Sequence, residues 1–342
     1  MTRSPNLIPL GEFKPSDQWQ THVNSIFYGI KGPEIHNHFQ TYVSLDHRLA
    51  HALAEDFFRD TVGKNPKGAV WTIQEWGVGN GNLAACFLSR LQEIDLNQQV
   101  YPFTHYILCD ESEEILKGTR ANPRLHKHEG RYSTVRIDAE NLNCFQSKSV
   151  TKIISNEIWD DLATKVVLKN ENQFYEEYLC PYLRADFLNV NEAKFLNQFQ
   201  NKDLDGLAQL PWFLDSIHWE RDFQRVDLND WPFSKPLIEH CHNLNDGIPM
   251  PINIGAFAAL KKAKELLAED SLGYTGFDYG MLELKDLNKE GRPYFNLYGG
   301  QYTFMVNFPL LEEVGLEIGF SEVQKEYQNE YVKRSLKSEV VG

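Results

Sequence analysis

The feature that most constrains the fold is the stretch of residues 70–94, where an apolar run, a glycine-rich turn and a helical pattern follow one another. The apolar run ends on a carboxylate, Glu75, and the chain then crosses Gly77, Gly79 and Gly81. Beyond these glycines, apolar residues recur at helical spacing. The stretch predicts a buried strand, a tight turn and an amphipathic helix whose N-terminus offers free N–H groups to a ligand.

The glycine spacing distinguishes two kinds of nucleotide site. A dinucleotide site favours G-x-G-x-x-G, but counting from Gly77 the third glycine would fall on Asn82. The spacing from Glu75 to Gly81 is E-x-G-x-G-x-G, which resembles the first motif of class I S-adenosylmethionine (SAM) methyltransferases. The backbone at Gly77, Gly79 and Gly81 would then lie beside the methionyl part of SAM, and a carboxylate suits its ammonium and sulfonium charges. The alternative is a glycine-rich turn without a ligand.

Two further predicted strands also end on acids. Residues 105–110 end on Asp110, about one βα unit after the glycine turn, where a carboxylate can accept hydrogen bonds from both ribose hydroxyls. The alternative is a helix N-cap at Asp110 or Ser112, and both interpretations can hold together. A third strand ends at Asp138, and Asp138-Ala139 resembles the step that holds the adenine amino group in class I methyltransferases.

A fourth predicted strand, residues 151–155, runs into a cluster of polar side chains. Asn156, Glu157, Asp160 and the neighbouring Asp161 gather where this strand ends. In an open α/β sheet the carboxyl ends of the strands hold the ligand, so these residues are candidates for the catalytic site. The alternative is that they only cap the following helix.

The strand–helix alternation predicts an α/β fold with a doubly wound, mostly parallel sheet. A strand within residues 298–308 is expected near the sheet edge, and we expect that edge strand to be antiparallel. The aromatic-rich residues 165–250 are expected to form a largely helical insertion that caps and shapes the substrate site, or else a packing elaboration with its own core. The expected domains are an N-terminal arm with helices at 1–65, a SAM-binding core at 66–164 and 251–342, and the insertion at 165–250.

The composition of the chain limits the kinds of ligand and partner that we expect it to bind. The chain has 342 residues and a formal net charge of −14, which argues against nucleic-acid binding and is compatible with a cationic substrate. The five cysteines are dispersed, and no apolar run is long enough to span a membrane, so we expect a cytoplasmic protein that does not act on a membrane. No metal is expected, because the histidines His36, His38, His47 and His51 lack further ligands at a familiar spacing.

Several motifs resemble, in order, those of the MidA-like SAM-dependent methyltransferases, the family that includes the mitochondrial complex I assembly arginine methyltransferase. The family's LELGPGRGTL resembles residues 74–83, its Y-x-x-V-E-x-S resembles residues 106–112, and its NEFFDALP resembles residues 156–163. Its IDYG is similar to residues 277–280, which contain Asp278. The resemblance covers about residues 35–335. Val78 replaces the proline of the glycine loop, and the Thr-x-Pro-Glu segment is reduced to TYVS at residues 41–44.

The resemblance implies an enzyme that uses SAM to N-methylate an arginine or another guanidino group of a protein or peptide. Carboxylates suit the planar guanidinium, so Glu157, Asp160 and Asp278 would orient it while Asn156 fixes the geometry. Two alternatives remain open. One is a SAM-dependent methyltransferase that acts on a small metabolite or natural-product intermediate, and the other is a non-catalytic methyltransferase-like binding or assembly module.

Overall fold

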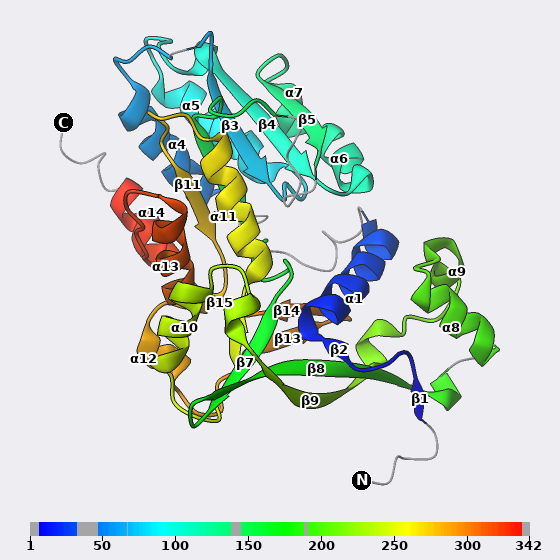
Figure 1. The fold of residues 1–342 in the computed structure, drawn as a ribbon. Coiled ribbons are helices and arrows are strands. Elements are labelled where there is room, and N and C mark those ends of the chain that lie inside the picture. Colours follow the sequence, from blue (N-terminus) through cyan, green and yellow to red (C-terminus); the bar gives the residue numbers. More distant parts are fainter. Residues whose placement is uncertain (1–6, 33–46, 67, 138–144, 188–190, 337–342) are drawn as a thin grey trace. The chain divides into compact units, whose positions relative to one another are not determined.

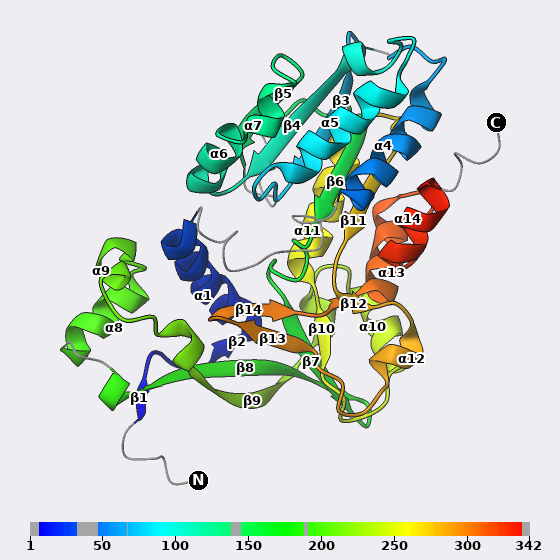
Figure 2. The ribbon, with the colours of Figure 1, turned by 180° about the vertical axis from the view of Figure 1, so that it is seen from behind.

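The computed structural model describes residues 7–32, 47–66, 68–137, 145–187 and 191–336, and the chain folds into two compact units. Unit 1 consists of Met1–Lys31, Trp159–Ala258 and Asp278–Val323, and unit 2 of Gly32–Ile158, Ala259–Phe277 and Gln324–Gly342. Each unit is therefore assembled from three separate stretches of chain. Figures 1 and 2 show the elements of both units from opposite sides.

Unit 2 is organised around a five-stranded parallel sheet. Its strands are β3 (Trp71–Trp76), β4 (Thr104–Asp110), β5 (Tyr132–Arg136), β6 (Lys152–Asn156) and β11 (Tyr274–Phe277). They lie in the order β11-β6-β3-β4-β5, and each neighbouring pair is parallel. The strand order reverses between β3 and β6, and in such sheets ligands bind outside the carboxyl ends of the strands at this switch point.

Helices complete the core of unit 2. They are α4 (Arg48–Thr61), α5 (Asn82–Ile94), the 3₁₀ turn η2 (Tyr101–Phe103), α6 (Glu113–Arg120), α7 (Pro123–His126) and α14 (Gln328–Leu336), while α11 (Ile254–Leu266) is shared with unit 1. Helix α4 packs against α5 and α14, and all three contribute to one hydrophobic core with the sheet. The centroid of the Phe87 ring lies 5.7 Å from that of Phe57 and 5.4 Å from that of Tyr106. The helical spacing of apolar residues predicted α4 and α5 correctly.

Unit 1 is built on an antiparallel sheet. Its strands are β1 (Leu7–Pro9), β2 (Lys14–Pro15), β7 (Lys165–Asn170), β8 (Gln173–Arg184), β9 (His218–Val226) and β10 (Met250–Ile252). The long strand β8 pairs with β7, β9, β1 and β2, and β10 pairs with β7. Strand β8 is thus the element that joins the N-terminal strands to the middle of the chain.

Unit 1 also contains helices, 3₁₀ turns and short strands outside this sheet. The helices are α1 (Ser16–Lys31), α8 (Glu192–Gln200), α9 (Leu204–Ala208), α10 (Ser234–His242), α12 (Leu284–Leu287) and α13 (Phe308–Ile318). Short 3₁₀ turns occur at η3 (Ala185–Phe187), η4 (Leu214–Ser216) and η5 (Leu228–Asp230). Strand β12 (Gly280–Met281) pairs in parallel with β15 (Val306–Asn307), and β13 (Phe295–Tyr298) forms an antiparallel hairpin with β14 (Gln301–Phe304).

The predicted fold class is confirmed, but two of its details are wrong. The five strands that the structure describes in the unit 2 sheet are all parallel, and the expected antiparallel edge strand instead forms β14 in unit 1. Gly299 and Gly300, both at positive φ, turn the chain back on itself so that β14 pairs locally with β13. The alternation of residues 298–308 indicated a strand but not its partner.

The expected largely helical insertion is also wrong, because residues 165–250 contain β7, β8 and β9 beside α8, α9 and α10. Consecutive buried residues such as Glu176 and Glu177 hide the alternation of β8, although its aromatic residues favour a strand. The expected domain boundaries at 65, 165 and 250 also differ from those of the two units.

Candidate functional site

The glycine turn between β3 and α5 lies at the switch point of the unit 2 sheet. Gly77, Gly79 and Gly81 have φ angles of +72°, +49° and +74°, in the left-handed region that favours glycine. The Gly77 amide donates to the carbonyl of Cys109 at 2.9 Å, and the Gly81 amide donates to that of Val78 at 2.9 Å. The predicted strand, turn and helix are therefore all present, with α5 beginning directly after Gly81.

Packing also requires two of these glycines, independently of a ligand. A Cβ on Gly77 would lie 2.3 Å from Cγ2 of Ile158, and one on Gly81 would lie 2.8 Å from Cγ2 of Thr119. The Thr119 hydroxyl donates to the Gly79 carbonyl at 2.8 Å, which ties α6 to the turn. The glycine pattern alone thus identifies the turn but not the ligand.

Glu75 lies beneath the turn, inside the core of the sheet. The residue is 4% exposed, and the Tyr106 hydroxyl donates to its Oε2 at 2.8 Å. Burial raises the pKa of the Glu75 carboxyl to about 8; the hydrogen bond from Tyr106 opposes this rise and the charge of Asp110 adds to it. The carboxyl group therefore links the end of β3 to the first half of β4.

Asp110 ends β4 and is hydrogen-bonded to neighbouring backbone. Its Oδ1 accepts from the Ser112 amide at 2.9 Å, and its carboxyl also accepts from the Val78 amide in the glycine turn. Burial raises the pKa of Asp110 to about 6 in spite of these hydrogen bonds. The Ser112 hydroxyl accepts from the Ile115 amide at 3.3 Å, which confirms the predicted N-cap of α6. Asp138 and Ala139 lie outside the described residues.

Asn156 ends β6 and Glu157 follows it, on the other side of the switch point from β4. Oδ1 of Asn156 is buried and has no hydrogen-bond partner among the described residues, and its Nδ2 donates to Oε1 of Glu157 at 3.2 Å. Glu157 has a φ of +55°, a strained conformation for a residue other than glycine. Its amide donates to the Phe277 carbonyl at 2.7 Å, and burial raises the pKa of its carboxyl. A buried acceptor without a partner, next to a residue whose backbone is strained, is typical of a functional site.

The two other predicted catalytic residues, Asp160 and Asp278, belong to unit 1. Oδ2 of Asp278 accepts from the amides of Trp159 at 2.7 Å and Asp160 at 3.3 Å, and its Oδ1 accepts from the Tyr279 amide at 2.8 Å. Burial raises the pKa of Asp278 to about 8, and the charge of Asp161 contributes to the rise. The Asp278 carboxyl thus fixes the backbone that follows Ile158.

The structure brings most of the predicted residues in unit 2 to one edge. The carboxyl ends of the adjacent strands β4, β3 and β6 carry Asp110, the glycine turn and the pair Asn156–Glu157. This edge presents carboxylate and amide oxygens as acceptors, together with the N-terminus of the thirteen-residue helix α5. It has the groups needed to hold a ligand with hydroxyl and amino donors.

Sequence reasoning missed a polar cluster in unit 1. Tyr28 and Gln301 both donate hydrogen bonds to the carboxylate of Asp161, and the two bonds from Gln301 to Asp161 and Tyr28 measure 2.6 and 2.7 Å. The available signal was the four-residue spacing of Gln20, Asn24 and Tyr28, which places them on one face of an amphipathic helix.

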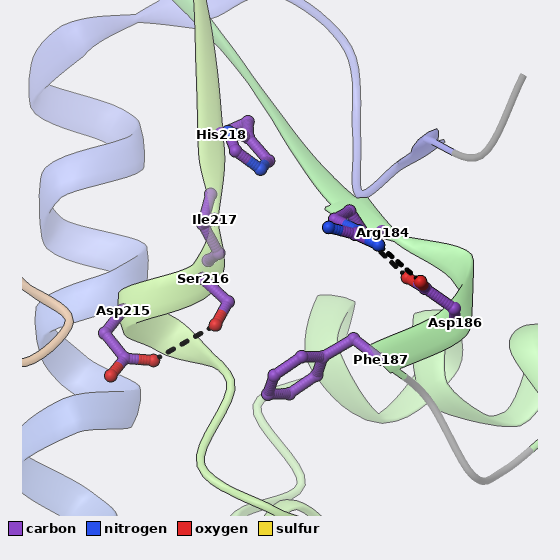
Figure 3. A pocket seen from close by; sticks show the side chains of 7 residues that line it. All are labelled: Arg184, Asp186, Phe187, Asp215, Ser216, Ile217 and His218. Carbon is purple, nitrogen blue, oxygen red and sulfur yellow. Dashed lines mark hydrogen bonds and ion pairs between the residues drawn. The ribbon is translucent and has the colours of Figure 1, made fainter. Parts of the chain in front are cut away.

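A surface pocket of about 540 Å³ lies elsewhere in unit 1 (Figure 3). Its lining residues are Arg184, Asp186, Phe187, Asp215, Ser216, Ile217 and His218. Arg184 and Asp186 neutralise each other through an ion pair, and no predicted site residue lines this pocket. It therefore has no part in the candidate site.

Two other expectations concern the histidines and the membrane. His36 and His38 lie outside the described residues, and the rings of His47 and His51 are 4.7 Å apart. Across the described ranges, no group of three or more His, Cys, Asp or Glu side chains is arranged to hold a metal ion. Of the helices described, none has both the length and the apolar character required to cross a membrane.

Comparison with known proteins identifies the family. The model of a family described as "Putative S-adenosyl-L-methionine-dependent methyltransferase" matches residues 52–282. One similar crystal structure is that of a Burkholderia thailandensis protein described as a "likely methyl transferase" and bound to S-adenosyl-homocysteine. The two sequences are 15% identical, and the TM-score is 0.57. The match covers 90% of this chain and 72% of the Burkholderia chain.

A second crystal structure, of an uncharacterised protein from the same organism, is 16% identical with a TM-score of 0.51 and covers 90% of this chain and 71% of its own. These likenesses concern the fold. No curated protein matches the chain. The family match spans more than half of the 342 residues and confirms the resemblance inferred from the motifs. The chain belongs to this family of S-adenosylmethionine-dependent methyltransferases, whose cofactor is SAM.

Proposed function

We propose that SAM binds at the carboxyl edge of the unit 2 sheet. The observation that carries the proposal is the meeting of the glycine turn, Asp110 and Asn156 at the switch point of a parallel sheet. Asp110 accepts hydrogen bonds from the ribose hydroxyls, and the backbone at Gly77, Gly79 and Gly81 lies beside the methionyl part. Asp138 and Ala139 bind the adenine amino group in this proposal.

The chemistry of this edge fits the cofactor. The buried Oδ1 of Asn156 lacks a partner within the described residues, and a ligand donor would satisfy it. The three glycines in the left-handed turn before α5 have no Cβ atoms, so a ligand can approach the backbone there. In this proposal Glu75 lies beneath the turn, and a cationic ligand bound there would lower the pKa of its carboxyl and favour the charged form.

We further propose that the acceptor is a guanidino group of a protein or peptide. SAM, when bound, supplies an electrophilic methyl group on its sulfonium. The acceptor nitrogen forms a bond to this carbon as the sulfur–carbon bond breaks, and the nitrogen loses one proton. In this proposal Glu157 takes that proton, and its raised pKa supports the role because it makes the carboxylate a better base, while Asn156 orients the acceptor.

The predicted roles of Asp160 and Asp278 remain proposals. Asp278 already accepts three backbone hydrogen bonds, so its role is best described as holding the segment that begins at Trp159. Asp160, which belongs to unit 1, stays a proposed catalytic carboxylate. The net charge of −14 supports a cationic acceptor over an anionic one.

Calorimetry tests the cofactor site. Asp110→Ala should weaken SAM binding at least about tenfold, because the ribose loses a charge-assisted hydrogen bond. Asp186→Ala is the matched control: Asp186 pairs with Arg184 on the surface of unit 1, and the affinity should stay within about twofold of the wild type. Equal SAM affinity in the wild type and Asp110→Ala would reject the ribose role.

Transfer of labelled methyl groups tests the acceptor. The probes are a synthetic peptide with a single arginine, the same peptide with lysine instead, and the small-molecule fraction of a lysate. Label in the arginine peptide alone supports the proposal, and label only in the small-molecule fraction contradicts it in favour of a metabolite acceptor.

Glu157→Gln should keep SAM binding and lose at least about a hundredfold in turnover, the usual contribution of a general base. Glu171→Gln is the matched control, because Glu171 also has a positive φ, of +54°, but lies in the β7–β8 turn. Retained turnover in Glu157→Gln would remove Glu157 from the proposed mechanism.

A further inference from the structure

Helix α1 has a row of polar side chains that lies outside the family motifs. Ser16, Gln20, Asn24 and Tyr28 are spaced four residues apart and therefore lie along one face of the helix. Ser16 and Gln20 are fully buried and Asn24 is 5% exposed, although the neighbouring buried positions of α1 are apolar. We call these four residues the polar ridge. Buried polar groups are costly unless they are paired, so their partners indicate what the ridge is for.

The first part of the ridge holds the backbone of residues 160–164. Gln20 Nε2 donates to the Asp160 carbonyl at 3.0 Å, and Gln20 Oε1 accepts from the Thr164 amide at 2.8 Å. The Ser16 hydroxyl donates to the Thr164 carbonyl at 3.1 Å. Two side chains of α1 thus fix both ends of this short segment.

The second part of the ridge surrounds one carboxylate. The Tyr28 hydroxyl donates to Oδ2 of Asp161, and Gln301 Nε2 donates to its Oδ1 at 2.6 Å. Asn24 Nδ2 lies 3.5 Å from the same Oδ1, and Asn24 also exchanges two 2.9 Å hydrogen bonds with the backbone of Tyr302. Asp161 is therefore the point where all three stretches of unit 1 are joined.

The segment held in this way continues the chain directly from Glu157. Only Ile158 separates Glu157 from Trp159, whose amide is bound by Asp278. Glu157 sits in a strained left-handed conformation, and such conformations persist only where the surrounding structure determines them. Anchoring the following residues restricts how the backbone at Glu157 can relax.

We propose that Tyr28, Asn24 and Gln301 are positioning residues for methyl transfer, which fix Asp161 and thereby hold Glu157 in the conformation that turnover requires. This inference rests on the proposed role of Glu157. The residues need not touch SAM or the acceptor, so they should affect kcat without affecting SAM affinity.

The test is Tyr28→Phe, which removes the hydroxyl and leaves the ring. Transfer to the arginine peptide should lose at least about tenfold in kcat, as expected for one hydrogen bond to a charged group, while the SAM Kd stays within about twofold. In a double-mutant cycle, Tyr28→Phe with Asp161→Asn should cost no more than the worse single variant, because both remove the same contact. Tyr175→Phe is the control, since its hydroxyl donates to Gln173 on the surface, and it should match the wild type.

Hydrogen exchange separates this inference from the proposed function. In Tyr28→Phe the amides of residues 160–164 should exchange at least about tenfold faster, while those of β8 and β9 are unchanged. Unchanged exchange in residues 160–164 overturns the inference, whatever the wild type methylates. So does faster exchange with a wild-type kcat. If the wild type binds SAM but leaves the arginine peptide unlabelled, the proposed acceptor fails and the exchange result decides the positioning role. Gln301→Leu, which removes the other hydrogen bond to the Asp161 carboxylate, replaces Tyr28→Phe if that variant does not fold.

Discussion

Glu75 places an ionisable group in the core of a parallel sheet, where charging it is costly. Its partner is the hydroxyl of Tyr106, which is itself fully buried. A phenol can donate to either form of the carboxyl, but it supplies no opposite charge, so burial dominates and raises the pKa of Glu75. The folded state therefore holds this proton more tightly than the unfolded chain does.

Stability should consequently depend on pH through Glu75. The pKa rises on folding from the ordinary 4.5 to about 8, so the unfolded chain loses this proton first. The contribution of this proton to the free energy of unfolding has its full value below about pH 4.5 and is lost as the pH rises to about 8. Glu75→Gln removes this dependence, so the Tm of the variant relative to the wild type should rise between pH 5 and 8 and then level off. The exposed Glu129→Gln should show no such trend, and a pH-independent difference for Glu75→Gln would contradict the argument.

Gly77 allows steric and conformational effects to be separated. Its φ of +72° resembles the +75° of Gly63, but a Cβ on Gly63 would meet nothing within 4 Å. Alanine at Gly63 should cost about 1 kcal/mol for the left-handed conformation. Alanine at Gly77 should cost a further ~1–3 kcal/mol, because its Cβ meets Ile158. Urea unfolding measures both, and combining Gly77→Ala with Ile158→Ala should recover part of the loss. Equal losses at Gly63 and Gly77 would exclude the contact.

Among the elements, α6 shows how one strand end serves two purposes. Asp110 binds the Ser112 amide, and the Ser112 hydroxyl in turn caps the helix. Ser112→Ala should therefore cost about 1 kcal/mol of stability in denaturant unfolding. SAM affinity should remain within about twofold, because the amide that Asp110 uses is still present. Ser112→Asn should restore most of the stability, and a large loss of SAM affinity in Ser112→Ala would show that the cap and the cofactor site are not separate.

Elements that depend on local signals were predictable from the sequence. Strand β3, the glycine turn, α5 and the cap at Ser112 each follow from residue types within a few positions of one another. Pairing over long distances was not predictable: β1 pairs with β8, with Leu7 opposite Arg184, and no local pattern encodes that contact. The polar ridge was not predictable either, because its partners Asp161 and Gln301 lie far along the chain. The strain at Glu157 has no signature in its sequence either.

For the whole molecule, ligand binding should report which unit holds the cofactor. SAM at about 100 times its Kd should raise the free energy of unfolding by about 2.7 kcal/mol through mass action. Because the proposed contacts lie in unit 2, amides of β3 and α5 should gain protection from hydrogen exchange while those of β8 and β9 change little. Equal gains throughout the chain, or gains confined to unit 1, would argue against the proposed location. S-adenosyl-homocysteine is a suitable second ligand, since it lacks only the transferred methyl group.

The division of each unit into separate stretches has a consequence for synthesis on the ribosome. Helix α14 covers the core of unit 2, where Tyr331 is 7% exposed and its ring centroid lies 5.1 Å from that of Phe277. This helix is translated after every residue of unit 1, so four strands of the parallel sheet emerge early, β11 follows later, and the sheet stays partly uncovered until its last helix is made. A nascent chain released before residue 328 would expose apolar surface beside α4, which makes truncated products of this protein natural clients for chaperones.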